Sequence, residues 1–133
     1  MRIVKSIQFD AAHYLDEGPA REGAQTKNLA AVAAGERPYA RMHGHSFTLE
    51  ATIEGEPDPK TGWVADFGDV ASALDELRDS LDHRLLNEVE GLGRPTLENI
   101  CRYAADRLRA KFPGLKQVKV ARPSNGEACL YDL

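Results

Sequence analysis

The apolar residues of this chain recur with a period of two near both ends and with the period of a helix between them. Alternation runs through Arg2 to Phe9 and through His45 to Glu54, which is typical of β-strands. It returns in Gln117 to Arg122 and in Ala128 to Leu133, on either side of the turn Pro123-Ser124-Asn125-Gly126. We therefore expect four strands in two sequential pairs.

Two amphipathic helices are expected between the strand pairs. The first begins at Phe67, where Asp66 or Asp69 can accept hydrogen bonds from the first amide groups, and runs to Leu81. The second begins after Pro95-Thr96. The residues predicted on the two buried faces are Val70, Leu74, Leu77 and Leu81, and Leu97, Ile100, Cys101, Ala104 and Leu108.

The element order β-β-α-α-β-β predicts an α+β fold, in which an antiparallel sheet carries both helices on one face. The chain has 133 residues, enough for a single domain, 1–133, with a substantial core. Tyr14 to Met42 shows no strand alternation, and we interpret it as a loop or insertion. Within it, Thr26 can cap a short helix that continues to Ala34 and that Gly35 stops.

Composition narrows the class of partner. The 17 Lys and Arg against 21 Asp and Glu give a net charge of -4, and no basic run is present. This balance argues against nucleic acid or an anionic membrane and favours a small soluble ligand. The sequence has neither the apolar core of a signal peptide nor a stretch of spanning length, so we expect a cytoplasmic protein. Cys101 and Cys129 form no Cys-x-x-Cys pattern and are expected to be free thiols.

Three of the four histidines have the spacing of a metal site on strands. His43 and His45 flank Gly44, and side chains two apart on a strand share one face. His13 follows the first strand and can join them at the tip of a hairpin. Three neutral imidazoles with an open fourth position are typical of catalytic zinc. Partly buried, hydrogen-bonded histidines without a metal are the alternative.

Asp82 and His83 follow the first predicted helix and can form an acid/base pair. The alternative is structural, because a histidine at the C-terminal end of a helix interacts favourably with the helix dipole. Glu98 in the first turn of the second helix has the same kind of explanation. From these residues alone, the structural explanation is the simpler one.

Five motifs in the same order resemble the 6-pyruvoyl-tetrahydropterin synthase and 6-carboxy-tetrahydropterin synthase family of the tunnelling fold. The motifs are Phe9-x-Ala11-x-His13, His43-Gly44-His45-x-Phe47, Gly62-Trp63-Val64-x-Asp66-Phe67, Leu81-Asp82-His83-x-x-Leu86-Asn87 and Pro95-Thr96-x-Glu98-Asn99. Together they extend over nearly the whole chain.

The resemblance implies a role for each motif. By this resemblance His13, His43 and His45 would bind zinc, and Asp82 with His83 would form an acid/base pair that transfers protons. Thr96 and Glu98 would lie near the pterin pocket. The family forms homo-oligomers, commonly hexamers built as dimers of trimers, with sites at subunit interfaces. A pterin-like substrate and a place in folate- or queuosine-related biosynthesis are therefore expected.

The first departure from the family pattern is Tyr39, which stands where the family's synthases carry a catalytic cysteine. A phenol is a much weaker acid than a thiol, so Tyr39 is a poor replacement as a base. Some relatives carry glutamate in place of this cysteine and cleave the side chain of the substrate. Glu36 lies nearby but at a different offset, and a solvated loop charge is the better explanation for it.

The second departure is Arg122, which follows Val118-x-Val120-x where the family has a glutamate that pairs with the pterin. Arginine suits a carboxylate, a phosphate or a carbonyl-bearing edge instead. Glu127 could replace the glutamate only if the strand register shifted. Cys129 has the same strand parity as Glu127, although a buried thiol is its simpler interpretation.

The leading hypothesis is a zinc-dependent lyase that acts on the side chain of a dihydroneopterin-like substrate by acid/base chemistry and breaks a carbon-oxygen or carbon-carbon bond. One alternative is a non-catalytic zinc-containing protein that binds a heterocycle. Another is a paralogue whose substrate differs because Tyr39 and Arg122 replace the family residues. A plain metal-dependent hydrolase is disfavoured, because no carboxylate stands beside the histidine motifs as a base.

Overall fold

The computed structural model describes residues 1–15 and 38–133. Its long elements are β1 (Arg2–His13), β2 (His43–Glu54), α2 (Phe67–Leu81), α3 (Leu97–Arg109), β3 (Leu115–Arg122) and β4 (Glu127–Asp132). The short 3-10 turns are η1 (Pro38–Ala40), η2 (Leu86–Glu88) and η3 (Pro123–Asn125). The strands form one antiparallel sheet in the order β1-β2-β3-β4. The helix predicted over Thr26 to Ala34 falls outside the described residues.

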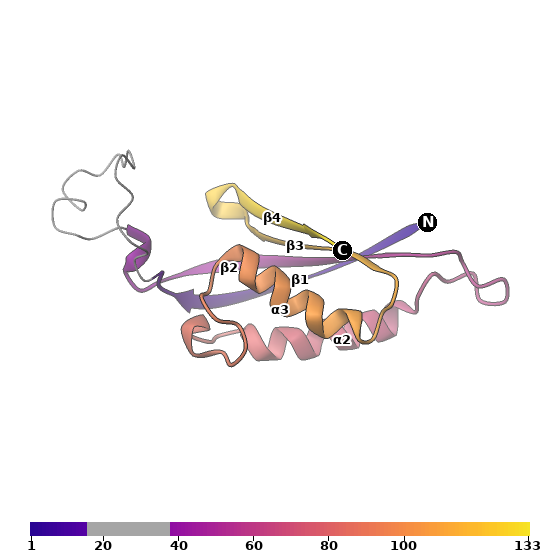
Figure 1. Ribbon diagram of the computed structural model, residues 1–133, viewed down its shortest axis with the longest axis horizontal. Helices are drawn as coiled ribbons and strands as arrows, with labels where there is room; N and C mark the ends of the chain where they lie inside the picture. Colours follow the sequence, from indigo (N-terminus) through magenta and orange to yellow (C-terminus); the bar gives the residue numbers. More distant parts are fainter. Residues whose placement is uncertain (16–37) are drawn as a thin grey trace.

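Both helices pack on one face of the sheet, α2 against β1 and α3 against β3 and β4 (Figure 1). The predicted α+β class and the predicted element order are therefore confirmed. No helix in the described part of the chain has both the length and the apolar character needed to cross a membrane.

Side-chain caps fix where the helices begin. The Asp66 carboxylate accepts a hydrogen bond from the Gly68 amide at 2.7 Å and so starts α2. The Thr96 hydroxyl accepts one from the Asn99 amide at 3.3 Å and starts α3. Every residue predicted on the buried helix faces is buried.

The core lies between the helices and the sheet. Phe9 and Phe47 stack at its centre, with ring centroids 4.9 Å apart and ring planes within 9° of parallel. Cys101 is fully buried in this core as a free thiol, and the thiol of Cys129 is also free. Burial raises the pKa of Cys101 to about 12, with a smaller contribution from Cys129, so Cys101 is no nucleophile at neutral pH.

The first two strands are longer than the alternation alone predicted. β1 continues past Phe9 to His13, because Ala11 and His13 keep the buried parity of Phe9. β2 begins at His43, the register partner of His13 and the last pair of the ladder. Since β3 pairs with β2 only from Thr48 onward, the histidine end of this hairpin projects beyond the β3–β4 hairpin.

The chain after α2 runs along the free edge of β1. The His83 amide donates to the Asp10 carbonyl at 2.6 Å, and the Ala12 amide donates to the Arg84 carbonyl at 3.0 Å. Ala12 and Leu85 form an isolated parallel bridge. The loop after α2 is thereby fixed beside the strand that carries His13.

Candidate metal centre and its surroundings

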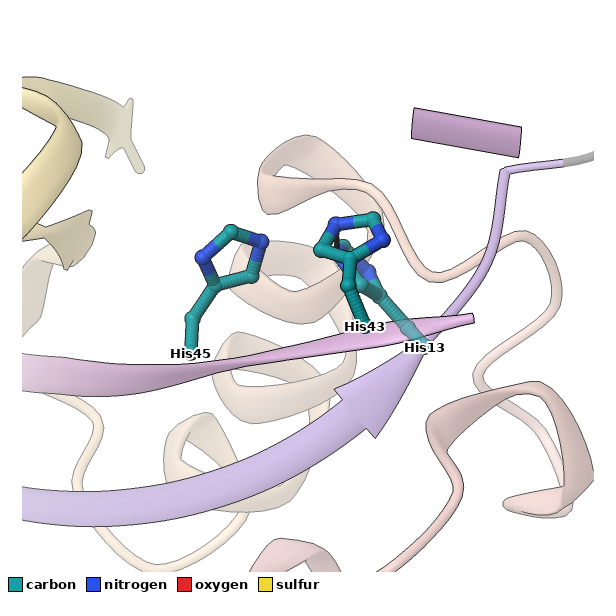
Figure 2. Close-up of side chains that lie close together, drawn as sticks. All are labelled: His13, His43 and His45. Atoms are coloured by element: carbon teal, nitrogen blue, oxygen red, sulfur yellow. Dashed lines mark hydrogen bonds between the residues drawn. The ribbon is translucent and has the colours of Figure 1, made fainter. Parts of the chain in front are cut away.

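His13, His43 and His45 bring their imidazoles together on the helix-facing side of the β1–β2 hairpin (Figure 2). One nitrogen from each ring lies within 4.8 Å of the other two. His13 is buried, whereas His43 and His45 are half-buried. Gly44 separates the two β2 histidines because a side chain there would press on the Ala11 carbonyl oxygen, 3.1 Å from the position of a Cβ.

Two backbone carbonyls orient two of the rings. The Nδ1 of His13 lies 2.9 Å from the Pro95 carbonyl oxygen, and the Nδ1 of His43 lies 2.6 Å from the Arg41 carbonyl oxygen. A carbonyl only accepts hydrogen bonds, so each Nδ1 carries a proton and each Nε2 presents a lone pair. These carbonyls are functional groups that the side-chain pattern of the sequence did not reveal.

The donor set fits a metal ion. The Nε2 atoms of His13 and His43 lie 3.0 Å apart. Two lone pairs at this distance repel unless a cation or proton stands between the rings. Two imidazole nitrogens bound tetrahedrally to zinc are separated by roughly 3.3 Å, close to the observed spacing.

The environment favours the uncharged form of His13 and of His45. Burial lowers the pKa of His13, an effect that the hydrogen bond to Pro95 opposes. Burial, followed by the nearby Arg122 guanidinium, lowers the pKa of His45 to about 4. Neutral imidazole is the form that binds a metal, so these two histidines need little deprotonation at neutral pH.

Arg122, Glu127 and Tyr39 form a polar chain beside the histidines. Arg122 Nη2 lies 2.6 Å from Glu127 Oε2, and Nη1 lies 3.5 Å from His45 Nε2. The Tyr39 hydroxyl donates to Glu127 Oε1 at 3.2 Å, and the Tyr39 ring lies 5.9 Å from the His43 ring. Arg122 and Glu127 are register partners, so Glu127 shares the face of Arg122 without the register shift that the sequence analysis required.

Asp82 and His83 form the predicted pair at the end of α2. His83 Nδ1 lies 3.1 Å from Asp82 Oδ2, and the Asp10 amide donates to Asp82 Oδ1 at 2.9 Å. That amide, with His83 as the next contribution, lowers the pKa of Asp82 and so keeps it ionised. His83 has a φ of 56°, in the left-handed region that favours glycine, and its side chain is 79% exposed.

A pocket of about 580 Å³ is lined by both His83 and His45. Most of the other hairpin residues that line it, Asp10, Ala12, Gly44 and Ser46, lie on the strand face opposite to that of the clustered histidines. Within the described residues, His83 makes no hydrogen bond or ring contact with the three clustered histidines. The Ser46 hydroxyl donates to the Asp10 carboxylate, and neither residue was singled out from the sequence.

The beginning of α3 lies next to the metal centre through Pro95, but its two predicted binding residues differ in role. Thr96 uses its hydroxyl to cap the helix. Glu98 is exposed in the first turn, where the helix dipole favours an acid. Glu36 falls outside the described residues.

Comparison with known proteins agrees with this arrangement. The family model described as 6-pyruvoyl tetrahydropterin synthase matches residues 2–132. The chain is 36% identical over 123 residues to the dihydroneopterin monophosphate aldolase of Pyrococcus furiosus, covering 92% of this chain and 86% of that protein. It is 34% identical over 124 residues to the 6-carboxy-5,6,7,8-tetrahydropterin synthase of Synechocystis sp., covering 89% and 83%.

Its fold is similar to that of the 6-pyruvoyl tetrahydropterin synthase of Caenorhabditis elegans, with a TM-score of 0.77 at 22% identity, covering 100% of this chain and 95% of that one. The sequence matches cover most of each protein, and the structural match extends over the whole sheet and both helices. The chain therefore belongs to the 6-pyruvoyl tetrahydropterin synthase family.

Proposed function

We propose that this protein is a zinc-dependent enzyme that acts on the side chain of a dihydroneopterin-like substrate by acid/base chemistry. The observation that carries the proposal is the convergence of three imidazoles, two of them oriented by backbone carbonyls. The family relationship supports a pterin substrate, since relatives bear names of pterin synthases and of a dihydroneopterin monophosphate aldolase.

His13, His43 and His45 would hold the metal, which supplies a Lewis acid that polarises an oxygen of the substrate side chain. His83 would take a proton from the substrate and return one to the product. Asp82 is ionised and in contact with His83 Nδ1, so it would fix the tautomer of the imidazole and stabilise its protonated form.

We propose that a complete site forms between subunits of a homo-oligomer. In one chain, His83 and His45 line the same pocket, but among the described residues His83 makes no hydrogen bond or ring contact with the clustered histidines. A second copy could bring its histidine cluster to the His83 of the first. In the described chain, the edge of β4 and the part of the β1 edge before Asp10 leave two places for strand pairing. A hexamer built as a dimer of trimers is the assembly that the family resemblance implies.

Carbon-carbon cleavage is the reaction that the site favours. Of the two thiols, Cys101 is buried in the core and Cys129 lies beside it in β4, so the described residues place no thiol next to the histidines. In an aldol cleavage, a base removes the proton of a side-chain hydroxyl, and that carbon becomes an aldehyde as its bond to the next carbon breaks. The bonding pair moves to the carbon attached to the ring, where conjugation with the ring stabilises it until a proton is returned.

The substrate would lie between the metal centre and the start of α3. Thr96, Glu98 and Arg122 are the residues that we propose to line its binding site. Pro95 binds His13 and directly precedes Thr96, so the first turn of α3 is anchored to the metal centre. Arg122 contacts His45 from the opposite side.

The test is conversion of defined pterins by the zinc-loaded protein. Dihydroneopterin and its phosphate esters are incubated with the enzyme, and products are separated and identified by mass spectrometry. We expect a 6-hydroxymethyl pterin together with a two-carbon aldehyde. Zinc-loaded protein that retains a pterin unchanged would support the non-catalytic alternative and contradict an enzymatic role.

A mixing experiment tests the shared site. The variants His45→Ala and His83→Ala should each be inactive, because each lacks one half of the chemistry. When the two are unfolded together and refolded with zinc, some mixed interfaces contain an intact metal cluster and an intact His83. Recovery of activity supports the site between subunits, whereas a mixture as inactive as its components contradicts it.

A further inference from the structure

The guanidinium of Arg122 is the polar group nearest the metal centre whose hydrogen bonds are incomplete. The Arg122 side chain is only 11% exposed. Its Nε is buried and has no hydrogen-bond partner among the described residues. Nη2 is paired with Glu127, and the contact of Nη1 is the 3.5 Å approach to His45 Nε2. A buried donor without an acceptor destabilises the protein, and does so more strongly when it is charged.

Metal binding removes the acceptor of Nη1 as well. A neutral imidazole has one lone pair, and the metal requires it. If the metal binds His45 Nε2, the lone pair is no longer available to Arg122. If the metal binds His45 Nδ1, the proton moves to Nε2, which then faces Arg122 as a second donor. In both cases two nitrogens of Arg122, Nε and Nη1, lack an acceptor once the metal is bound.

Glu127 does not complete the hydrogen bonds of Arg122. Its Oε2 lies 2.6 Å from Arg122 Nη2 without a hydrogen bond of good geometry among the described residues, and its Oε1 accepts from the Tyr39 hydroxyl. The carboxylate and the phenol therefore hold the guanidinium in place without satisfying its remaining donors. With a divalent metal bound, the positive charges of the ion and of Arg122 would exceed the single negative charge of Glu127. A net positive charge at the site favours an anion over a neutral ligand.

We propose that Arg122 binds an anionic oxygen group of the substrate, a carboxylate or a phosphate monoester, next to the histidine cluster, with Glu127 and Tyr39 as positioning residues. This inference rests on the proposed metal centre and adds the substrate class to the proposed function. Arginine suits both groups because its planar fork can donate two parallel hydrogen bonds.

The test measures anion binding by the zinc-loaded protein, using isothermal titration calorimetry. Inorganic phosphate, glycolate and the neutral analogue ethylene glycol serve as ligands. We expect the wild type to bind phosphate or glycolate and not ethylene glycol, and the stronger of the two anions identifies the substrate group. Arg122→Gln should weaken that binding by roughly tenfold or more, and Arg122→Lys by less.

Lys119→Gln is the matched control, because Lys119 lies on the same strand but pairs with Glu50 on the opposite face. It should bind anions as the wild type does. Tyr39→Phe should lower anion affinity a few-fold at unchanged zinc content and unchanged melting temperature, which a purely structural role would not produce. Since Arg122→Gln leaves Glu127 unpaired, the double variant R122Q/E127Q provides a second, charge-balanced test.

Equal anion affinity in the wild type and in both Arg122 variants would overturn this inference while leaving zinc binding and pterin turnover intact. Conversely, Arg122-dependent anion binding by a zinc-loaded protein that converts no pterin would support this inference and contradict the proposed reaction. Zinc content, measured by mass spectrometry in every variant, separates the two outcomes from simple loss of the metal.

Discussion

Arg122 and Glu127 face each other across the β3–β4 hairpin, on the sheet face that carries the histidines. The residues that join them are the 3-10 turn η3 (Pro123–Asn125) and Gly126, which follows it. Gly126 closes the turn with a φ of 67°. This turn sets the register, and the register turns two opposite charges into an ion pair beside the metal centre. The pair replaces the single acidic residue that the family resemblance predicts at position 122.

Reversing the pair tests its contribution to stability. Arg122→Glu places two carboxylates opposite each other, and we expect the free energy of unfolding to fall by about 1–2 kcal/mol, since Glu127 is partly exposed. The swapped variant R122E/E127R should recover most of this loss. Urea unfolding of the metal-free proteins measures both values. An unchanged midpoint in R122E would show that the pair contributes nothing to the fold.

Removal of one clustered histidine should abolish stoichiometric zinc binding. His45→Ala leaves two imidazoles, and we expect its zinc content after dialysis to fall to a small fraction of one equivalent. His83→Ala is the control with the same chemical change, and it should keep a full equivalent because His83 is outside the cluster. Full metal content in His45→Ala would refute the ligand assignment.

His83 adopts a backbone conformation that suits glycine better than histidine. We expect His83→Gly to leave stability unchanged or to raise it by up to about 1 kcal/mol, because the left-handed conformation carries little strain in glycine. Activity on the pterin should be lost in the same variant. Thermal unfolding and turnover are measured together. A destabilised variant with normal turnover would indicate a structural role for His83 instead of a catalytic one.

The lowered histidine pKa values predict how the metal-free protein responds to acid. The unfolded histidines titrate near 6.5, whereas the pKa of His45 in the folded protein is about 4 and that of His13 is also lowered. Between these values the unfolded chain binds protons that the folded chain excludes. Stability should therefore be complete above about 6.5 and decline as the pH falls towards about 4.

Urea unfolding of the chelator-treated protein over this pH range measures the effect. The variant His45→Gln lacks one of the titrating groups and should show a shallower decline. Asp82 has a separate effect at lower pH. Because its pKa is lowered from the usual 3.8, the stability that its charged form contributes is lost only as the pH falls below that value. An equally steep decline in His45→Gln would exclude His45 as the origin.

The sequence predicted the elements well because each has a local cause. The stripe from Val70 to Leu81 and the cap at Thr96 are decided by residues within a few positions of each other. The grouping of His43 with His45 is local for the same reason, since both lie on one strand. Placing His13 beside these two histidines required only that the first two strands pair with each other. The observed register, in which His13 faces His43, confirms that they do.

What the sequence could not predict depends on contacts between distant residues. The position of His83 follows from the hydrogen bond that its amide donates to the carbonyl of Asp10, 73 positions earlier in the chain. No periodicity of the sequence encodes that contact. The protonation of His13 follows from the Pro95 carbonyl, a backbone atom without a side-chain signature. The partnership of Glu127 with Arg122 could not be predicted, because the turn at η3 fixes a register that composition does not reveal.

The pairing of His13 with His43 has a consequence for how this family can diversify. These two residues end β1 and begin β2, and they form the last pair of the ladder. A metal ion bound to both would therefore link the two ends of the stretch that connects these strands. The entropy of closing a stretch of chain grows only with the logarithm of its length, by about 0.6 kcal/mol for each doubling. Insertions and deletions between the two histidines are therefore inexpensive, and natural variants can exchange this stretch of sequence while the donor atoms keep their places.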